Sequence, residues 1–557
     1  MGQSLIDFLG TLEGRAGSRT HMHVIGSSDS GKSKFLEMLM RDAVLSRPRR
    51  GFCFIDFHGK TYHDLLRFFA TARTHQEVVL INPSNPEYIT GFNPFLDAGE
   101  DVSTTVDRRI DLTIKPWGAK STDATPTLER VSRILYHFAI AAQEPLPNAA
   151  LLLDFNNRDI FNFALSLLNT PEHDIAYRKL AELAEIKTPT QWRGETGSTD
   201  NRLTRFVGSK AIRRFVGMRE GNVSIPDLMV RNAIVLVNLA PSGHLHAQAA
   251  RVFAAMLLNE FFEAALRRAG TAKHYFLFLD EFQEYITYDL AAMLDQVRKG
   301  GLHLVMAHQR FGQLTRDPEI ADAIRVNARL KVIFGGLPYD DLVPVANDLF
   351  LTEINERQIK ETYYSQAVTG YERVTNYSQS EAAAWSDSAV AGHAQSIDSS
   401  AQEIDHGHRV TKSESEASTK SGARQFGEST SFLPIHTDRV SGRSEWSREE
   451  KVSKVVERLR KLPQRNAVVV VGADEPVQYE VPTLAEYPLP KNAVATWTTR
   501  TYVQNGALPA AEADAHLERS RVQFLAKVDE AMGRKRRKKP QPPTGNDPKP
   551  NTKRPGI

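Results

Sequence analysis

The stretch that most constrains the fold is Gly-Ser-Ser-Asp-Ser-Gly-Lys-Ser at residues 26–33. Its pattern, G-x-x-x-x-G-K-S, allows the backbone to turn its N–H groups inward round a phosphate. A short apolar run at residues 21–25 precedes the stretch, and Phe35, Leu36 and Leu39 follow it at the spacing of one helical face. A strand, a glycine-containing loop and a helix in this order predict a phosphate-binding loop of the kind found in nucleoside triphosphatases.

Each residue type in this loop has a physical role toward ATP and Mg²⁺, the two cofactors that the motif predicts. The two glycines permit the tight turn, and the start of the following helix adds a partial positive charge. The lysine would reach the β- and γ-phosphates, and the last serine would bind Mg²⁺ through its hydroxyl. The predicted nucleotide-binding residues are Gly26, Ser27, Ser28, Asp29, Ser30, Gly31, Lys32 and Ser33, with Ser33 also a metal ligand.

The remaining strand signals predict an α/β fold with a mainly parallel sheet. Nearly continuous apolar runs, separated by helical segments, are typical of parallel strands that are covered on both faces. From about residue 97 to 229 the strand signals stop, and amphipathic helices are predicted at 128–142, 160–168, 175–186 and 203–216. We therefore expect an α-helical domain inserted into the α/β domain. The apolar runs are at residues 51–55, 78–81, 233–239, 275–279, 302–307 and 331–334.

These signals divide the 557 residues into an α/β domain in two parts, an insertion and a C-terminal region. The α/β domain comprises residues 1–96 and 231–370, and the helical insertion comprises 97–230. A segment rich in Ser, Gln and Glu at 371–440 is expected to be a flexible linker. A helix and strands within 441–530 are expected to pack on the core, and 531–557 is expected to be a basic, disordered tail.

Two acids at the end of an apolar strand, Asp280 and Glu281, predict the second half of the site. In a phosphate-loop enzyme, Asp280 would hold Mg²⁺ and Glu281 would act as the base for the attacking water. Gln309 ends the next strand, where it is either a sensor of the γ-phosphate or a satisfied polar residue. Arg298 precedes that strand and is either a catalytic arginine, which would act on a neighbouring subunit's site, or a solvated cation at a helix end.

Taken together, these motifs resemble the HerA–FtsK superfamily, and most closely the TraG/TraD-type coupling proteins of conjugation and type IV secretion. The resemblance covers roughly residues 20–350. It implies a RecA-like core, a hexameric ring and ATP-driven movement of DNA through a pore. It also implies that Arg298 acts in trans and that Gln309 senses the γ-phosphate. The residues that carry the resemblance are 26–33, 54–59, 91–95, 278–282, 298–302 and 307–309.

Composition adds an expected location and leaves the cargo open. No apolar window is long enough to cross a membrane, no signal peptide is visible, and the single cysteine, Cys53, suits a reducing compartment. These features predict a cytoplasmic protein without an integral membrane segment. A membrane, secretion, relaxase or nuclease partner is compatible with them.

The net charge of +3 hides an uneven distribution of charge along the chain. Residues 531–557 contain nine Lys or Arg and one acid and thus carry +8, which leaves −5 on the rest. Charge alone therefore does not establish DNA as the cargo. The alternatives are an ATPase that translocates or assembles proteins, and an ATP-gated interaction protein.

Overall fold

The centre of the molecule is a nine-stranded sheet. Seven neighbouring strands, from β8 to β3, are parallel, while β13 and β14 extend one edge with antiparallel pairing. The sheet order is β14 (Val477–Glu480), β13 (Asn466–Val471), β8 (Leu330–Phe334), β1 (Met22–Ile25), β7 (Leu302–His308), β6 (Tyr275–Leu279), β2 (Gly51–Asp56), β5 (Ile234–Asn238) and β3 (Val78–Ile81). The computed structural model describes residues 7–14, 19–72, 74–94, 101–114, 126–242, 244–268, 273–285, 290–314, 318–380, 390–392, 413–415, 425–486, 489–490 and 492–533.

Helices cover both faces of the sheet, as the unbroken apolar strands predict. Alternate residues of one strand enter different cores: Cys53 and Ile55 of β2 pack on one side, and Phe52 and Phe54 on the other. The second side is covered by α1 (Phe8–Glu13), α2 (Lys32–Leu45), α3 (Lys60–Thr71) and α18 (Ala493–Gln504). The first side is covered by α12 (Ala247–Arg267), α13 (Leu290–Lys299) and α14 (Pro318–Asn327). The expectation of a parallel sheet with two covered faces is confirmed.

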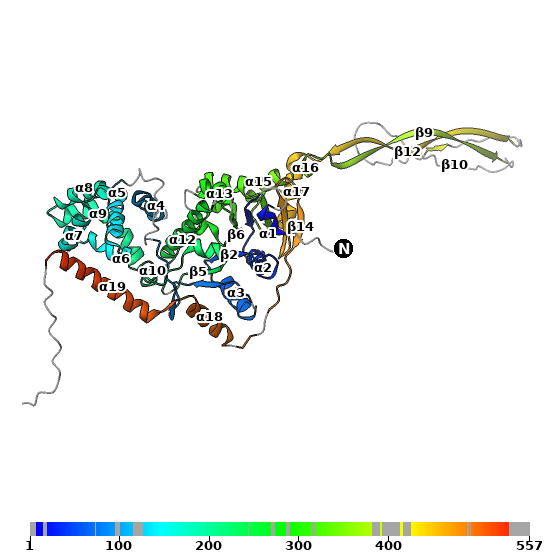
Figure 1. Cartoon of the computed structure of the whole chain (residues 1–557). Helices are drawn as coiled ribbons and strands as arrows, with labels where there is room; N and C mark the ends of the chain where they lie inside the picture. Colours follow the sequence, from blue (N-terminus) through cyan, green and yellow to red (C-terminus); the bar gives the residue numbers. More distant parts are fainter. Residues whose placement is uncertain are drawn as a thin grey trace, which may run out of the picture. The chain divides into compact units, whose positions relative to one another are not determined.

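Between β4 (Tyr88–Ile89) and β5 the described residues are mainly helical, where the sequence predicts an inserted helical domain (Figure 1). The predicted helix at 203–216 is two helices, because the turn at Gly208 and Ser209 separates α9 from α10. The helices of this segment are α4 (Val102–Ile114), α5 (Pro126–Ala142), α6 (Leu146–Ala149), η3 (Ala150–Leu153), α7 (Arg158–Leu168), η4 (Pro171–His173), α8 (Asp174–Ala184), α9 (Pro189–Val207), α10 (Lys210–Val216) and α11 (Ile225–Val230).

The C-terminal region returns to the core in several places. After β8, α15 (Tyr339–Leu349) and α16 (Leu351–Asn355) share a small core with α17 (Arg448–Arg460), and β13 and β14 then join the sheet. Next, β15 (Leu508–Pro509) pairs with β4, and the final helix, α19 (Ala510–Ala531), runs along the helical insertion (Figure 1). There Phe524 contacts Phe138 and Phe163, and Arg214 forms two hydrogen bonds with Asp514.

Residues 355–450 form a separate compact unit, and here the expected flexible linker is wrong for the parts that the structure describes. Residues 371–380 and 425–440 belong to two long antiparallel strands, β9 (Ile359–Ser380) and β12 (Gln425–Glu445) (Figure 1). Thr, Tyr and Val recur between the serines, and these residues favour strands. The linker was predicted from the polar composition of the segment, which does not take these strand-forming residues into account. Two short strands, β10 (Val390–Gly392) and β11 (Ser413–Ser415), also pair with each other.

Two further expectations concern the chain's ends and membranes. Residues 534–557, which make up almost all of the predicted basic tail, lie outside the described residues. Within the described part of the chain, none of the helices has the length and apolar character needed to cross a bilayer.

Candidate nucleotide-binding site

The loop at residues 26–33 has the closed shape that a phosphate cradle requires. It follows β1 directly, and Gly31 caps the start of α2 with φ of 119°, a conformation that strongly favours glycine. A Cβ on Gly26 would lie 2.5 Å from the Cβ of Phe334 and 2.7 Å from the hydroxyl of Ser30. That hydroxyl donates to the carbonyl of Ser27 at 2.8 Å, which holds the loop closed. The loop thus places the N-terminus of α2 toward its own concave side.

Lys32 lies across this loop. Its ammonium group donates to the carbonyl oxygens of Gly26 at 2.7 Å and Ser27 at 2.8 Å. Burial lowers the pKa of Lys32, although the nearby carboxylates of Glu281 and Asp280 raise it in part. The ammonium group of Lys32 thus lies at the mouth of the loop, within reach of the position that a terminal phosphate would take.

Two acids reach the same place from the end of β6. Asp280 and Glu281 are only 3% and 6% exposed, and the Ser33 hydroxyl lies 3.4 Å from Oδ2 of Asp280. Asp56 ends the neighbouring strand β2, and its carboxylate accepts the backbone N–H groups of His58 and Tyr62, each at 2.8 Å. The carboxyl ends of the parallel strands lie at the same end of the sheet, and this arrangement places the three acids close together.

The two predicted acids have opposite electrostatic surroundings. Burial, together with Asp56 and Glu281, raises the pKa of Asp280 to about 7. Burial also acts to raise the pKa of Glu281, but hydrogen bonds from Gln283 and Gln309 outweigh it and hold that pKa below its ordinary value. Glu281 is thus kept ionised, whereas Asp280 carries a charge that its surroundings do not fully compensate. Paired acids with divergent pKa values are typical of catalytic sites.

Gln309 joins the acid to the loop. Its side-chain amide donates to Oε1 of Glu281 at 2.7 Å, and its own Oε1 accepts the hydroxyl of Ser28 at 3.3 Å. The strand β7 lies between β1 and β6 in the sheet, which is why the residue after it stands between the loop and the acid. The structure therefore brings Lys32, Ser33, Asp280, Glu281 and Gln309 together.

Arg298 does not join them within the same chain. It lies in the last turn of α13, before the start of β7, and its Nη1 donates to the carbonyl of Arg19 at 3.4 Å. The loop and the acids follow the carboxyl ends of parallel strands, whereas Arg298 precedes the amino end of one. Arg298 therefore lies at the opposite end of the sheet from the site.

Three further residues that the sequence analysis did not predict contact this site, two through their side chains and one through its backbone. Nε2 of His58 lies 3.4 Å from Oε1 of Glu281, and the position of His58 after a strand end beside β6 could have indicated it. The side chain of Gln464 donates to the backbone carbonyl of Asp29 at 2.9 Å. The backbone N–H of Arg465 donates to the backbone carbonyl of Ser30 at 2.8 Å. These last two come from the C-terminal region, and no local motif marks them.

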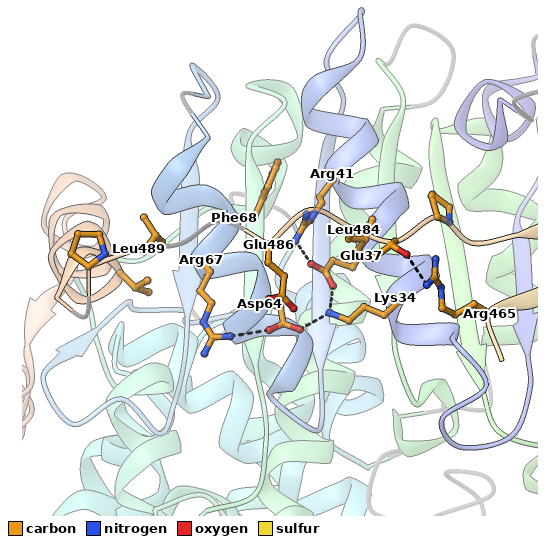
Figure 2. Close-up of a pocket in the computed structure, with 14 residues that line it drawn as sticks. Lys34, Glu37, Arg41, Asp64, Arg67, Phe68, Arg465, Leu484, Glu486 and Leu489 are labelled. Carbon is orange, nitrogen blue, oxygen red and sulfur yellow. Dashed lines mark hydrogen bonds and ion pairs between the residues drawn. The ribbon is translucent and has the colours of Figure 1, made fainter.

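A separate cavity of about 590 Å³ lies beside α2 (Figure 2). It is bounded by α2, α3 and a C-terminal segment that includes Leu484 and Glu486, and none of the predicted site residues lines it. Its charges pair with one another, since Lys34 binds both Glu37 and Asp64 at 2.8 Å. The Lys34–Asp64 pair connects the two helices, so we do not place the nucleotide in this cavity.

The strand order and the loop define the fold. The loop strand β1 and the acid strand β6 are separated by one strand, β7, within a parallel sheet that is covered on both faces. The chain has a RecA-like P-loop fold.

Comparisons with solved structures find partial similarities. The bacterial conjugative coupling protein TrwBΔN70 in an unbound form is 15% identical, with a TM-score of 0.45 over 84% of this chain and 86% of that one. Plasmid coupling protein TrwB in complex with ADP and Mg²⁺ is 15% identical, with a TM-score of 0.44 over 84% and 87%. VirB4 of Thermoanaerobacter pseudethanolicus is 14% identical, with a TM-score of 0.38 over 59% and 80%. TrwB is, by its description, the type of coupling protein that the sequence motifs resemble.

No family model and no curated protein matches the chain. With TM-scores below 0.5, the structural similarities add nothing to the strand order and loop geometry on which the fold assignment rests.

The raised pKa of Asp280 predicts a pH-dependent cost in stability. The folded chain binds a proton at Asp280 up to a pKa of about 7, against an ordinary value of 3.8. The proton bound at Asp280 therefore contributes its full stabilisation of the folded chain below about pH 4, and this contribution is lost as the pH rises through 7. We expect Asp280→Asn to raise the free energy of unfolding of the nucleotide- and metal-free protein at pH 8, by as much as ~4 kcal/mol. Urea unfolding at pH 8 and pH 4 measures this.

At pH 4 the gain from Asp280→Asn should be small, because the aspartate is then protonated in the folded chain. Asp438→Asn, which changes an exposed acid in β12, should leave stability nearly unchanged at both pH values. Equal gains from Asp280→Asn at both pH values would contradict the electrostatic explanation.

Proposed function

We propose that the chain binds ATP with Mg²⁺ and hydrolyses it. The single observation that carries this proposal is the continuous set of contacts from the loop to the acids: Ser33 to Asp280, and Ser28 through Gln309 to Glu281. In this arrangement Lys32 and the loop N–H groups hold the phosphates. Glu281, kept ionised, orients and deprotonates a water, and Gln309 positions Glu281 relative to the loop.

The residues present fit a magnesium ion. A hydroxyl and buried carboxylate oxygens are the ligands that Mg²⁺ prefers, and Ser33 and Asp280 supply both. The raised pKa of Asp280 marks a surplus of negative charge, which a divalent cation would neutralise. When bound, Mg²⁺ would neutralise the negative charge that develops on the phosphate oxygens.

We further propose that hydrolysis drives the movement of DNA, as in a conjugative coupling protein that works as a homo-oligomeric ring. The ordered motifs of residues 26–33, 278–282, 298–302 and 307–309 support this assignment. The position of Arg298 is compatible with the ring, since this arginine lies at the end of the sheet opposite its own site, so that a catalytic role would be toward a neighbouring copy. A relaxase, a nuclease or a membrane partner would then deliver or receive the DNA.

Steady-state ATP hydrolysis with and without DNA tests the cargo. We expect single- or double-stranded DNA to stimulate turnover several-fold, and the stimulation to fall steeply as salt rises, because DNA is gripped through its phosphates. Arg298→Ala should lower turnover in the assembled protein, and mixing it with Glu281→Gln should partly restore turnover if the arginine acts in trans. Turnover that is indifferent to DNA would favour a protein motor, and ATP binding without turnover would favour an ATP-gated interaction protein.

A further inference from the structure

Gln309 stands just beyond the paired part of its strand. In the register of β7 with its two neighbours, the last paired residue is His308, which pairs with Ile25. The side chain of Gln309 nevertheless spans the site, from the Ser28 hydroxyl to Oε1 of Glu281. Because strand pairing ends at His308, it does not by itself fix the backbone of the next residue. The direction of Gln309 must therefore be set by other contacts.

A side chain four residues further along the chain binds the backbone of Gln309. Oε1 of Gln313, the last residue of η6 (Phe311–Gln313), accepts the N–H of Gln309 at 3.1 Å and that of Arg310 at 3.2 Å. A side-chain amide oxygen has two lone pairs, and these two N–H groups occupy both of them. The amide nitrogen of Gln313 cannot accept either bond, so the two contacts also fix the orientation of its amide group. Gln313 thereby sets the direction in which the chain leaves β7.

The second half of the turn is held from a different element. The carboxylate of Asp341, at the start of α15, accepts the N–H groups of Phe311 and Gly312. Four successive N–H groups, those of residues 309–312, are thus bound by two side chains, Gln313 and Asp341. Of these two side chains, only that of Gln313 binds the residue that enters the site.

The carbonyl side of the turn is held from the sheet. Nδ1 of His308 lies 3.0 Å from the carbonyl oxygen of Arg310, and a carbonyl can only accept, so this nitrogen donates. Nε2 of His308 then accepts from Nε2 of His23 in β1 at 2.6 Å, which requires neutral rings. Burial lowers the pKa of both histidines, to about 4 for His308, in agreement with this. The backbone N–H of Gln313 donates to the same carbonyl at 3.1 Å, so Gln313 connects Gln309 to an anchored turn.

We propose that Gln313 is a positioning residue for ATP hydrolysis: by holding the backbone of Gln309, it keeps the Gln309 side chain between the phosphate loop and Glu281. The inference rests on the proposed function, because it assigns Gln313 a part in that reaction. Gln313 acts through Gln309 and not on the phosphate or the water. Its effect on the rate is nevertheless substantial, because a misplacement of about 1 Å near reacting groups can cost about 10²-fold.

A double-mutant cycle on turnover tests this role in the full chain. Gln313→Met removes the accepting oxygen and keeps the length of the side chain. We expect it to lower kcat about ten-fold and to leave ADP affinity within about two-fold. Gln313→Glu, which keeps an accepting oxygen, should retain most of the turnover. Since Gln313 acts through Gln309, adding Gln313→Met to Gln309→Ala should cost less than about a further two-fold.

Amide hydrogen exchange without nucleotide measures the positioning itself, independently of hydrolysis. In Gln313→Met, the segment 308–314 should exchange at least about ten-fold faster, because the N–H groups of Gln309 and Arg310 lose their acceptor. Unchanged exchange of 302–307, in β7, would show that the variant is folded. The matched control is Gln248→Met, at an exposed glutamine in the first turn of α12, which should alter neither turnover nor the exchange of 308–314.

Three results would overturn the role of Gln313. These are an equal loss of turnover from Gln313→Met with and without Gln309→Ala, normal turnover in Gln313→Met, and unchanged exchange of 308–314 in that variant. Absence of ATP hydrolysis in the unchanged protein would instead reject the proposed function. The exchange experiment would then still decide whether Gln313 holds the turn, so the two failures are distinguishable.

Discussion

Glu281→Gln is expected to lower the rate of ATP hydrolysis by about 10²–10⁴-fold, the usual contribution of a positioned general base. The substitution keeps the size of the side chain and can retain the hydrogen bond from Gln309, but it removes the carboxylate that would accept a proton from water. ATP affinity should change little, because in the proposed mechanism Glu281 acts on the attacking water and does not belong to the phosphate loop. A coupled turnover assay and a fluorescent-nucleotide titration measure the two quantities separately.

The control for Glu281→Gln is Glu284→Gln, which changes a nearby glutamate in η5 (Phe282–Tyr285) that pairs with Arg251. It should leave turnover within about two-fold, because surface ion pairs contribute little. If both variants retained normal turnover, the base would have to be sought elsewhere. His58, which contacts Glu281, would be the first residue to examine.

Lys32→Ala is expected to lower turnover by at least about 10²–10³-fold and also to weaken ATP binding. A preorganised charged donor in a buried site stabilises the developing negative charge strongly, and its removal typically costs this much. The lysine also compensates part of the negative charge of Asp280 and Glu281, so its loss leaves more of that charge uncompensated. Turnover and nucleotide affinity would be measured as for Glu281→Gln.

Lys34→Ala is the matched control, two residues further along the same helix. Lys34 binds Glu37 and Asp64 beside the charged cavity (Figure 2), and among the described residues its side chain forms no hydrogen bond or ion pair with the loop or with Asp280 and Glu281. We expect turnover close to that of the unchanged protein, with a small loss of stability. A large loss of turnover in Lys34→Ala, matching that in Lys32→Ala, would mean that the cavity beside α2 participates in nucleotide binding.

The positions of Gln309 and Arg298 illustrate what sequence reasoning could and could not predict. Both lie next to β7, and the sequence places each at a strand or helix end. Only the strand order shows that Gln309 stands between β1 and β6. The position of Arg298 at the other end of the sheet follows from its place before β7, which the sequence already indicates. Strand order depends on which distant segments pair, and the local pattern of apolar residues carries little information about that choice.

The expectation of a flexible linker was wrong for residues 371–380 and 425–440 for a related reason. Strands β9 and β12 form a two-stranded ribbon, and each is polar enough to resemble disordered sequence, with its partner tens of residues away in the chain. The bulge at Thr369 in β9 is defined by the register between the two strands. A one-residue change in register reverses every side chain beyond it, and neither strand alone specifies that register.

By itself, the sequence determined the phosphate loop, the two acids at a strand end and the parallel sheet covered on both faces. These features depend on neighbouring residues, because a glycine turn, a helix start and an unbroken apolar strand are local properties. The tertiary structure alone decided that Gln464 and Arg465 support the loop, that His58 contacts Glu281, and that β9 and β12 form a ribbon. Those contacts join segments far apart in the chain, and they follow from how the whole chain packs and in which register its strands pair.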